Sequence, residues 1–239
     1  MSDSKLVTSH YWTRNYSSRN GTKITKIIIH HMAGNLNAKQ CYNVWKSREA
    51  SAHNAIDKYV NIGQLVHESY RAWSVANRTW DSKAVTIECA NSTGSPNWKV
   101  SDATIKSLIK LVADIAYRNG FKKITYTGGT GGTLLMHCWF MSTSCPGPYL
   151  KTKFSYIAKE ADKLLQQKRN GKEPTPTPTS SYKVKVSVSD LYIRKGPGTS
   201  YATNGFIKPG VYTIVETSGS WGKLKSGQGW ICLDYTKKV

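Results

Sequence analysis

The sequence is poor in acidic residues and in long apolar runs. It contains 14 Asp and Glu against 34 Lys and Arg, which gives a formal net charge of +20. No apolar run reaches the length of a membrane-spanning helix, so we expect no membrane insertion. The basic residues are spread along the chain without a block of five or six like charges, which excludes a basic tail. This diffuse charge favours a polyanionic partner such as nucleic acid, an anionic membrane or an anionic cell-wall polymer, and charge alone does not choose among them.

Cysteine is also scarce, with five residues: Cys41, Cys89, Cys138, Cys145 and Cys232. An odd number without regular spacing, in a chain of this length, excludes the disulfide framework of a small secreted domain. Reduced thiols and synthesis in a cytosol fit this usage better. Residues 1–5 contain no apolar signal-peptide core, so we expect synthesis in the cytoplasm without a signal peptide. If the protein acts outside the cytoplasm, something else must release it.

A stretch rich in proline and threonine divides the chain. Residues 168–181 end in Pro-Thr-Pro-Thr-Pro-Thr-Ser-Ser, and such an alternation is typical of an extended, semi-rigid linker with nothing to bury. We therefore expect two domains, residues 1–167 and residues 182–239. The first is long enough to bury a sizeable core.

The longer domain alternates strands with helices. We expect strands over residues 24–29, 52–56, 64–67 and 84–89. Helices are expected over residues 37–46, 101–118 and 153–165. Ser101 is a suitable N-cap for the second of them, and apolar residues recur on one face of the last two. Strands that alternate with helices indicate an α/β layer fold.

The shorter domain has a different pattern. Short segments of alternating character cover residues 184–188, 191–194, 205–207, 212–216, 222–224 and 229–232. Gly, Pro and Ser residues between these segments mark turns. The pattern predicts a small all-β barrel.

Residue types that ligate metals occur at two places about a hundred positions apart. An apolar run ends in His30 and His31, and His137 lies eight residues before Cys145, which precedes Pro-Gly-Pro. Two imidazoles and one thiolate make three protein ligands, the number that a catalytic zinc site uses. Because adjacent residues on a strand point to opposite faces, only one of His30 and His31 can easily reach the metal. The same geometry excludes Cys138 if its segment is extended.

A hydrolytic metal site also needs a group that takes and returns a proton. Glu88 lies inside the apolar segment 84–89, where an acidic side chain is costly unless it is paired or functional, and it is the best candidate. The competing interpretation is a glutamate at a strand edge that faces solvent. His53 either lines the site or has a packing and hydrogen-bonding role, and the sequence favours neither.

The motifs and their order resemble type 2 N-acetylmuramoyl-L-alanine amidases, a family that includes zinc amidases of phages and the peptidoglycan recognition proteins. Within about residues 20–165 they are Ile-Ile-Ile-His-His, Ser-Ala-His-Asn-Ala-Ile-Asp, Arg-Ala-Trp, Val-Thr-Ile-Glu and His-x7-Cys-Pro-Gly-Pro-Tyr. The combination is specific, whereas no single motif is. The resemblance implies a mixed sheet flanked by helices, a Zn²⁺ cofactor, and hydrolysis of the amide bond between N-acetylmuramic acid and L-alanine in bacterial peptidoglycan.

The resemblance also implies a role for individual residues. It makes His30, His137 and Cys145 the zinc ligands and Glu88 the catalytic acid and base. Thr143 stands two positions before the ligand cysteine, where the family has a Lys or Thr that helps to bind the oxyanion.

The chain departs from the family's pattern at two positions. Ala52 stands where some members have a catalytic Tyr, and Ser74 stands where many have a His. Because these two side chains are absent, the catalytic role depends more strongly on Glu88.

The C-terminal segment resembles bacterial SH3-type domains. The resemblance lies in residues 191–201, 219–224 and 229–231. Such modules commonly bind peptidoglycan, so the resemblance implies a cell-wall-binding domain over residues 182–239. The alternative is a structural barrel that binds no ligand. Trp230 is expected in the core. Tyr192, Tyr201 and Trp221, if exposed, would be suited to binding a flat polymer.

Three functions compete. The first is a wall-degrading enzyme, either a phage or prophage endolysin or an autolysin, that is released by lysis or through a holin and acts on peptidoglycan of Gram-positive type. The second is a recognition protein that holds peptidoglycan without cutting it, and the complete His/His/Cys set argues against it. The third is a basic nucleic-acid binder, for which the chain lacks a reading motif. We expect the first function, in a monomer.

Overall fold

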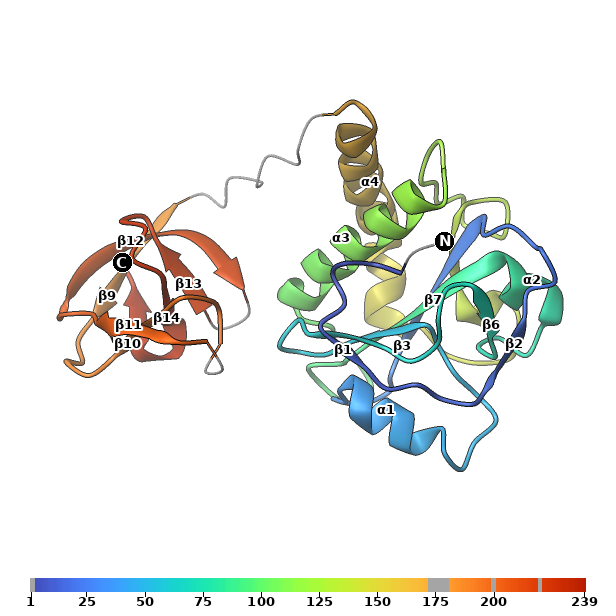
Figure 1. The fold of residues 1–239 in the computed structure, drawn as a ribbon, viewed down its shortest axis with the longest axis horizontal. Coiled ribbons are helices and arrows are strands. Elements are labelled where there is room, and N and C mark those ends of the chain that lie inside the picture. Colours follow the sequence, from blue (N-terminus) through green and yellow to red (C-terminus); the bar gives the residue numbers. More distant parts are fainter. Residues whose placement is uncertain (1–2, 172–180, 199–200, 219–220) are drawn as a thin grey trace. The chain divides into compact units, whose positions relative to one another are not determined.

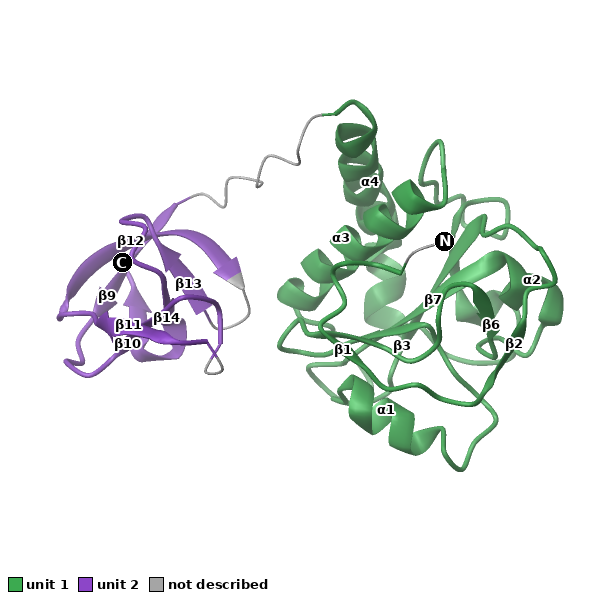
Figure 2. Ribbon diagram, in the orientation of Figure 1, with its two compact units in different colours: residues 1–173 green, residues 174–239 purple. Residues whose placement is uncertain are grey.

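The structure is a computed structural model that describes residues 3–171, 181–198, 201–218 and 221–239. It divides into two compact units, Met1–Glu173 and Pro174–Val239 (Figure 2). Each unit has its own hydrophobic core. Most of the predicted linker, residues 168–181, lies outside the described residues. Its first two residues belong to a helix that ends at Arg169, so the N-terminal unit extends further than predicted.

A six-stranded sheet lies at the centre of the N-terminal unit, in the order β1-β5-β4-β7-β3-β8 (Figure 1). The strands are β1 (Ser9–His10), β3 (Lys26–His31), β4 (Asn54–Ile56), β5 (Ile62–Gln64), β7 (Ala84–Cys89) and β8 (Leu134–Met136). β4 and β5 pair antiparallel, whereas the other neighbours are parallel, so the sheet is mixed as the resemblance implied. A separate ribbon pairs β2 (Tyr16–Ser18) with β6 (Tyr70–Ala72).

Helices cover both faces of this sheet. They are α1 (Ala38–Val44), α2 (Arg78–Lys83), α3 (Asp102–Arg118) and α4 (Pro148–Arg169), and a short 3-10 helix, η1, spans His137–Trp139. α3 and α4 pack side by side, and their apolar faces share a core with Ile27 and Ile29 of β3 (Figure 1). Ile28 faces the other way and packs with Val75 and Leu135. β3 is therefore buried on both faces, which explains its continuous apolar run.

Several predicted elements are confirmed. Strand 84–89 is β7, and helix 101–118 is α3, whose N-cap Ser101 accepts a hydrogen bond from the backbone N–H of Thr104 at 3.1 Å. α4 begins earlier than predicted, because Pro148 can occupy the first turn of a helix without losing a hydrogen bond.

Other elements were misplaced or missed. β5 lies earlier than the predicted segment 64–67, because the turn before it ends at Asn61, which donates to Asp57 at 2.9 Å. Five elements were not predicted: β1, β2, β6, β8 and α2. Four of these are strands of two or three residues and the fifth is a six-residue helix, all too short to display a hydrophobic period.

The C-terminal unit is a seven-stranded antiparallel sheet in the order β11-β10-β14-β13-β12-β9-β15. Its strands are β9 (Tyr182–Val186), β10 (Tyr192–Arg194), β11 (Thr203–Phe206), β12 (Gly210–Ser218), β13 (Trp221–Leu224), β14 (Trp230–Cys232) and β15 (Thr236–Lys238). Each of the six predicted segments overlaps a strand, and β15 is additional. Trp230 is buried as expected. Tyr192 and Tyr201 are exposed, and Trp221 is half-buried.

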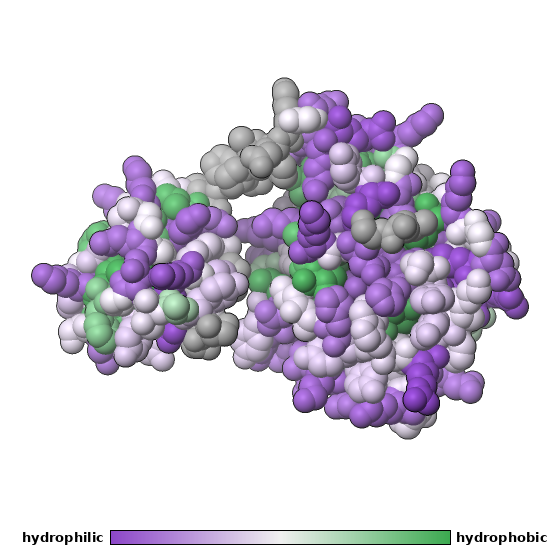
Figure 3. All heavy atoms as spheres, viewed as in Figure 1, coloured by the Kyte–Doolittle hydropathy of each residue, from purple (hydrophilic) through white to green (hydrophobic). Residues whose placement is uncertain are grey.

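The surface of both units is mainly hydrophilic in the view of Figure 3, with small hydrophobic patches. Among the helices of the described residues, none combines the length and the apolar character needed to cross a bilayer. All five cysteines are free thiols.

Candidate metal centre

The register of the central strands positions His30 and Glu88, the first part of the centre. Ile27 and Ile29 of β3 pack against α3 and α4, so the alternate residues Ile28 and His30 point to the opposite face of the sheet. β7 runs parallel to β3 with Glu88 directly beside His30. An imidazole and a carboxylate therefore lie on the same face at neighbouring positions of the two central strands.

A loop supplies the second part. His137 follows directly after β8, the other parallel neighbour of β3. The chain then turns back, and the N–H of Cys138 donates to the carbonyl of Cys145 at 3.0 Å. The N–H of Cys145 donates to Oγ1 of Thr143 at 3.2 Å, which fixes the cysteine at the end of the loop.

Three side chains meet where these two parts converge. One ligand atom each from His30, His137 and Cys145 lies within 4.8 Å of the other two, and no other group of three such side chains occurs among the residues that the structure describes. Nε2 of His30 and both ring nitrogens of His137 are buried without a hydrogen-bond partner. Buried polar atoms without a partner are costly, and a bound cation would satisfy these. Two imidazoles and a thiolate fit Zn²⁺.

Burial sets the protonation states of the three groups. It lowers the pKa of His137 to about 4 and that of His30 well below its usual value, so both rings are neutral at neutral pH and can ligate a metal. Burial raises the pKa of the Cys145 thiol. A bound cation would offset this effect, because metal coordination deprotonates a thiol.

His31 lies on the other face of β3, outside the cluster, as strand alternation predicted. Its backbone N–H donates to Sγ of Cys145 at 3.4 Å, and its ring meets Trp98 edge-on at a centroid distance of 5.6 Å. Gly147 lies against the His31 ring. Its φ is +85°, and a Cβ added there would lie 2.9 Å from two atoms of the His31 ring. His31 therefore links the sheet to the cysteine loop through packing and through a backbone donor.

Glu88 is the acidic group of the centre. Its Oε1 lies 4.0 Å from Nδ1 of His30, beyond hydrogen-bonding distance, and its Oε2 has no hydrogen-bond partner. Burial raises the pKa of Glu88 to about 8, opposed by the positive charge of Arg48. The competing interpretation, a solvent-facing glutamate at a strand edge, is wrong, because β7 lies between β3 and β4 and the Glu88 side chain is only 16% exposed.

Sequence reasoning missed Arg48. Its charge lowers the pKa of both Glu88 and His137, although its own side chain is exposed. Asn15 fixes the segment that carries it, because its side-chain amide donates to the Arg48 carbonyl at 2.7 Å and to the carbonyls of Trp45 and Ala50. Arg48 belongs to no motif, so only the folded arrangement could reveal it.

His53 has a packing and hydrogen-bonding role. It is fully buried, its Nδ1 accepts from the N–H of Thr86 at 3.0 Å, and its Nε2 lies 3.1 Å from the carbonyl of Tyr70. Burial, and then the nearby Arg19 charge, lowers its pKa to about 3. Ala52, at the position of the tyrosine that some family members carry, is buried and offers no functional group.

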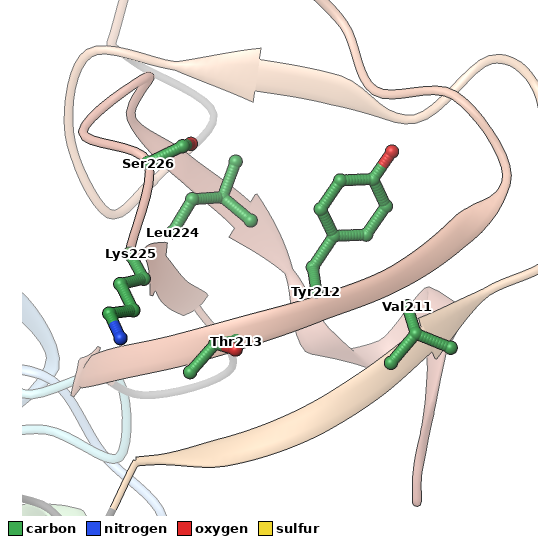
Figure 4. A pocket seen from close by; sticks show the side chains of 6 residues that line it. All are labelled: Val211, Tyr212, Thr213, Leu224, Lys225 and Ser226. Carbon is green, nitrogen blue, oxygen red and sulfur yellow. The ribbon is translucent and has the colours of Figure 1, made fainter.

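A small open pocket lies on the C-terminal unit. Figure 4 shows its lining: Val211, Tyr212, Thr213, Leu224, Lys225 and Ser226. These residues provide one charged side chain and no histidine, cysteine or carboxylate, so the pocket does not resemble a hydrolytic centre.

Comparisons with known proteins agree with the architecture of the N-terminal unit. The sequence model of a family described as N-acetylmuramoyl-L-alanine amidase matches residues 20–148. A search of curated protein sequences gave no match. Among solved structures, the hydrolase AmiA of Staphylococcus aureus in complex with its ligand is similar, with a TM-score of 0.51 at 17% identity over 73% of this chain and 89% of that one. An identity this low shows a common fold only.

Two further structures are similar at lower scores. An AmpD derivative aligns with a TM-score of 0.49 and 16% identity over 66% of this chain and 99% of that one. The endolysin amidase LysCS from Clostridium intestinale aligns with a TM-score of 0.48 and 19% identity over 62% of this chain and 92% of that one.

Proposed function

The chain belongs to the N-acetylmuramoyl-L-alanine amidase family, and we propose that residues 1–167 form a zinc hydrolase domain. Its reaction is cleavage of the amide bond between N-acetylmuramic acid and L-alanine in bacterial peptidoglycan. One observation carries the proposal: the ligand atoms of His30, His137 and Cys145 converge within 4.8 Å beside the buried carboxylate of Glu88. A protein that only holds its ligand has no need for this set.

The three ligand side chains would hold the zinc ion through two neutral imidazoles and one thiolate. When bound, zinc supplies a Lewis acid that polarises a carbonyl and lowers the pKa of water. The hydrogen bond from the His31 N–H stabilises the negative charge on Sγ of Cys145 and orients it toward the two histidines.

Glu88 would act as the acid and base. Burial raises its pKa to about 8, which lies close to neutral pH, so the carboxyl group can accept a proton and later release it to the leaving amine. Its Oε2 has no partner within the protein and is available for this exchange.

Thr143 would assist at the carbonyl oxygen. Its Oγ1 already accepts a hydrogen bond from the Cys145 N–H, and its own O–H is not used in that bond. The hydroxyl can therefore donate to the substrate oxygen as negative charge develops on it.

Digestion of purified cell walls tests the reaction. We expect new L-alanine amino termini and intact glycan strands, identified by mass analysis of the products. Breakage of a glycosidic bond or of a peptide cross-link would contradict the assignment. Binding without any cleavage would favour the alternative, a recognition protein that does not cut peptidoglycan.

Metal analysis tests the cofactor separately. We expect one zinc ion per chain in the wild type and none in the double variant His137→Ala, Cys145→Ser. Full zinc occupancy in that variant would place the metal elsewhere. The single variant Cys41→Ser is the matched control, because Cys41 is also a buried thiol but lies in α1, outside the cluster.

The C-terminal unit would bind the cell wall. We propose that residues 182–239 form an SH3-type module, which the independent core, the all-antiparallel strands and the exposed Tyr192 and Tyr201 support. A wall-binding module raises the concentration of the hydrolase at an insoluble polymer.

The proposed setting is that of an endolysin or autolysin. The protein would be made in the cytoplasm and would meet its substrate after lysis or through a holin. Peptidoglycan of Gram-positive type is the proposed partner, and a monomer is the proposed state.

A further inference from the structure

Five aromatic side chains of the N-terminal unit form a continuous exposed row, and we propose that this row is a binding site for the glycan strand of peptidoglycan. The row consists of His10, Trp12, Tyr16, His67 and Tyr70. The inference rests on the proposed function, because that function makes a glycan polymer the substrate. The row takes no part in the proposed chemistry.

Ring contacts connect the members into one surface. Trp12 stacks on His67 with ring centroids 3.8 Å apart and an angle of 19° between the rings. His10 meets Trp12 at 5.1 Å, and His67 meets Tyr70 at 6.5 Å. Tyr70 contacts Tyr16 at 4.6 Å. Chain segments more than fifty residues apart in sequence thus build a single array of rings.

The row is open to solvent along its length. Trp12 is 44% exposed, and Tyr16 and Tyr70 are each 40% exposed. His10 and His67 are exposed as well. Single exposed aromatic residues are ordinary, but a contiguous set of five on a strongly basic chain marks an interaction surface.

Neighbouring structure holds the row in place before any ligand arrives. The carboxylate of Asp3 accepts hydrogen bonds from Nδ1 of His67 at 2.7 Å and from the N–H of Glu68 at 2.9 Å. Tyr16 and Tyr70 lie on the paired strands β2 and β6, which lie side by side in Figure 1. A fixed array loses little conformational entropy on binding, which favours affinity.

The chemistry of the row fits sugar rings. Indole, phenol and imidazole combine a flat face with a polar edge that donates or accepts hydrogen bonds. A pyranose has the matching character, with C–H groups on its faces and hydroxyl groups around its rim. The carboxylate that bonds to the row, Asp3, would repel a polyanion such as nucleic acid. The sugars of uncut peptidoglycan meet no such penalty, because the lactyl carboxyl of N-acetylmuramic acid is held in the amide bond to L-alanine.

One end of the row is well separated from the metal centre. β1, which carries His10, is three strands from β7 and four from β3 in the sheet. At about 4.8 Å per strand, these separations are roughly 14 and 19 Å. A single sugar could not reach both places, whereas a glycan strand could, so the row would select polymer over fragments.

Fluorine NMR of the full chain, labelled with 5-fluorotryptophan, tests the proposal. The probe is a neutral oligosaccharide of N-acetylglucosamine, because the lactyl carboxyl of a peptide-free N-acetylmuramic acid would be ionised. The Trp12 resonance is assigned by its absence from the variant Trp12→Phe. We expect it to shift saturably with the oligosaccharide, and we expect Tyr70→Ala to weaken this binding by about tenfold, the scale of one lost aromatic contact.

Tyr156→Ala is the matched control, because Tyr156 is 49% exposed on α4, outside the row, and its loss should leave the dissociation constant unchanged. If Tyr70→Ala does not fold, Tyr70→Leu keeps the volume without the ring and carries the same expectation. A Trp12 resonance that does not respond to the oligosaccharide would overturn the proposal. A response to single-stranded DNA but not to the sugar would overturn it in favour of a nucleic-acid surface.

The same variants separate this proposal from the proposed function. If the wild type binds the oligosaccharide at Trp12 but releases no L-alanine termini from walls, the row stands and the amidase assignment fails. If walls are cut and Tyr70→Ala matches Tyr156→Ala in binding and in KM for walls, the row has no glycan role. We expect a higher KM for walls in Tyr70→Ala and an unchanged KM in Tyr156→Ala.

Discussion

Replacing Gly147 by alanine should weaken zinc binding although position 147 supplies no ligand. The φ and ψ angles of Gly147, +85° and 158°, belong to a region that only glycine adopts readily. An alanine Cβ would also lie 2.9 Å from the ring of His31 and 3.4 Å from Cβ of Trp98. Backbone strain of this kind costs about 1–3 kcal/mol.

The substitution should act on the metal through His31. Because the His31 ring is packed against Trp98, relief of the contact moves the loop that carries Cys145, and this movement stretches the 3.4 Å hydrogen bond from the His31 N–H to Sγ. Loss of such a supporting contact lowers metal affinity by about 10–100-fold. Competition with a chromophoric chelator measures the zinc affinity, and the thiolate-to-metal absorption of the cobalt form reports on the Cys145 bond.

Gly120→Ala is the matched control. Gly120 has a φ of +71° at the end of α3, and a Cβ there would meet nothing within 4 Å. It should lose about 1–2 kcal/mol of stability through backbone strain alone and keep its zinc affinity. Equal zinc affinities for Gly147→Ala, Gly120→Ala and the wild type would refute the link between His31 packing and the metal.

Three other outcomes are expected. Glu88→Gln should bind zinc and walls normally but lose about 10²–10⁴-fold in turnover, measured as release of L-alanine termini; near-normal turnover would move the proton-transfer role to another residue. The pKa of His53 is lowered from 6.5 to about 3 by burial and by the Arg19 charge, so the unfolded chain binds a proton that the folded chain does not. The free energy of unfolding should therefore be highest above pH 6.5 and fall toward pH 3 by up to about 1.4 kcal/mol per pH unit, and His53→Asn should remove this part of the slope in urea titrations. A chain lacking residues 182–239 should pellet less with walls than the full chain at high salt, where screening removes the attraction of exposed charges; equal pelleting at every salt concentration would reject a specific wall-binding module.

Much of the candidate metal centre could be predicted because it rests on strand geometry. The alternation of side chains along β3 separates His30 from His31, and the structure places them on opposite faces. Glu88 stood out because a carboxylate in an apolar strand requires a reason, and the parallel register of β3 and β7 puts it beside His30. Local periodicity separated the two histidines and singled out Glu88, and the family resemblance then chose His30.

Residues whose roles depend on distant contacts could not be predicted. The charge of Arg48 acts on Glu88 only because the chain folds so that the two residues come near each other. The contact between Gly147 and His31 joins positions more than a hundred residues apart. Trp12 and His67 become neighbours only once β1 and β5 have paired. None of these contacts leaves a period or a spacing in the sequence.

The candidate metal centre joins two kinds of backbone, which should differ in their resistance to local unfolding. His30 and Glu88 lie on central strands whose opening requires unfolding of the whole sheet. In contrast, His137 begins the short 3-10 helix η1 and Cys145 lies on irregular chain, in a loop closed by the bond from the Cys138 N–H to the Cys145 carbonyl. Removal of the metal should therefore speed amide hydrogen exchange in residues 137–147 and leave β3 and β7 protected. The strands would then act as the fixed half of the centre and the loop as the half through which the ion enters and leaves.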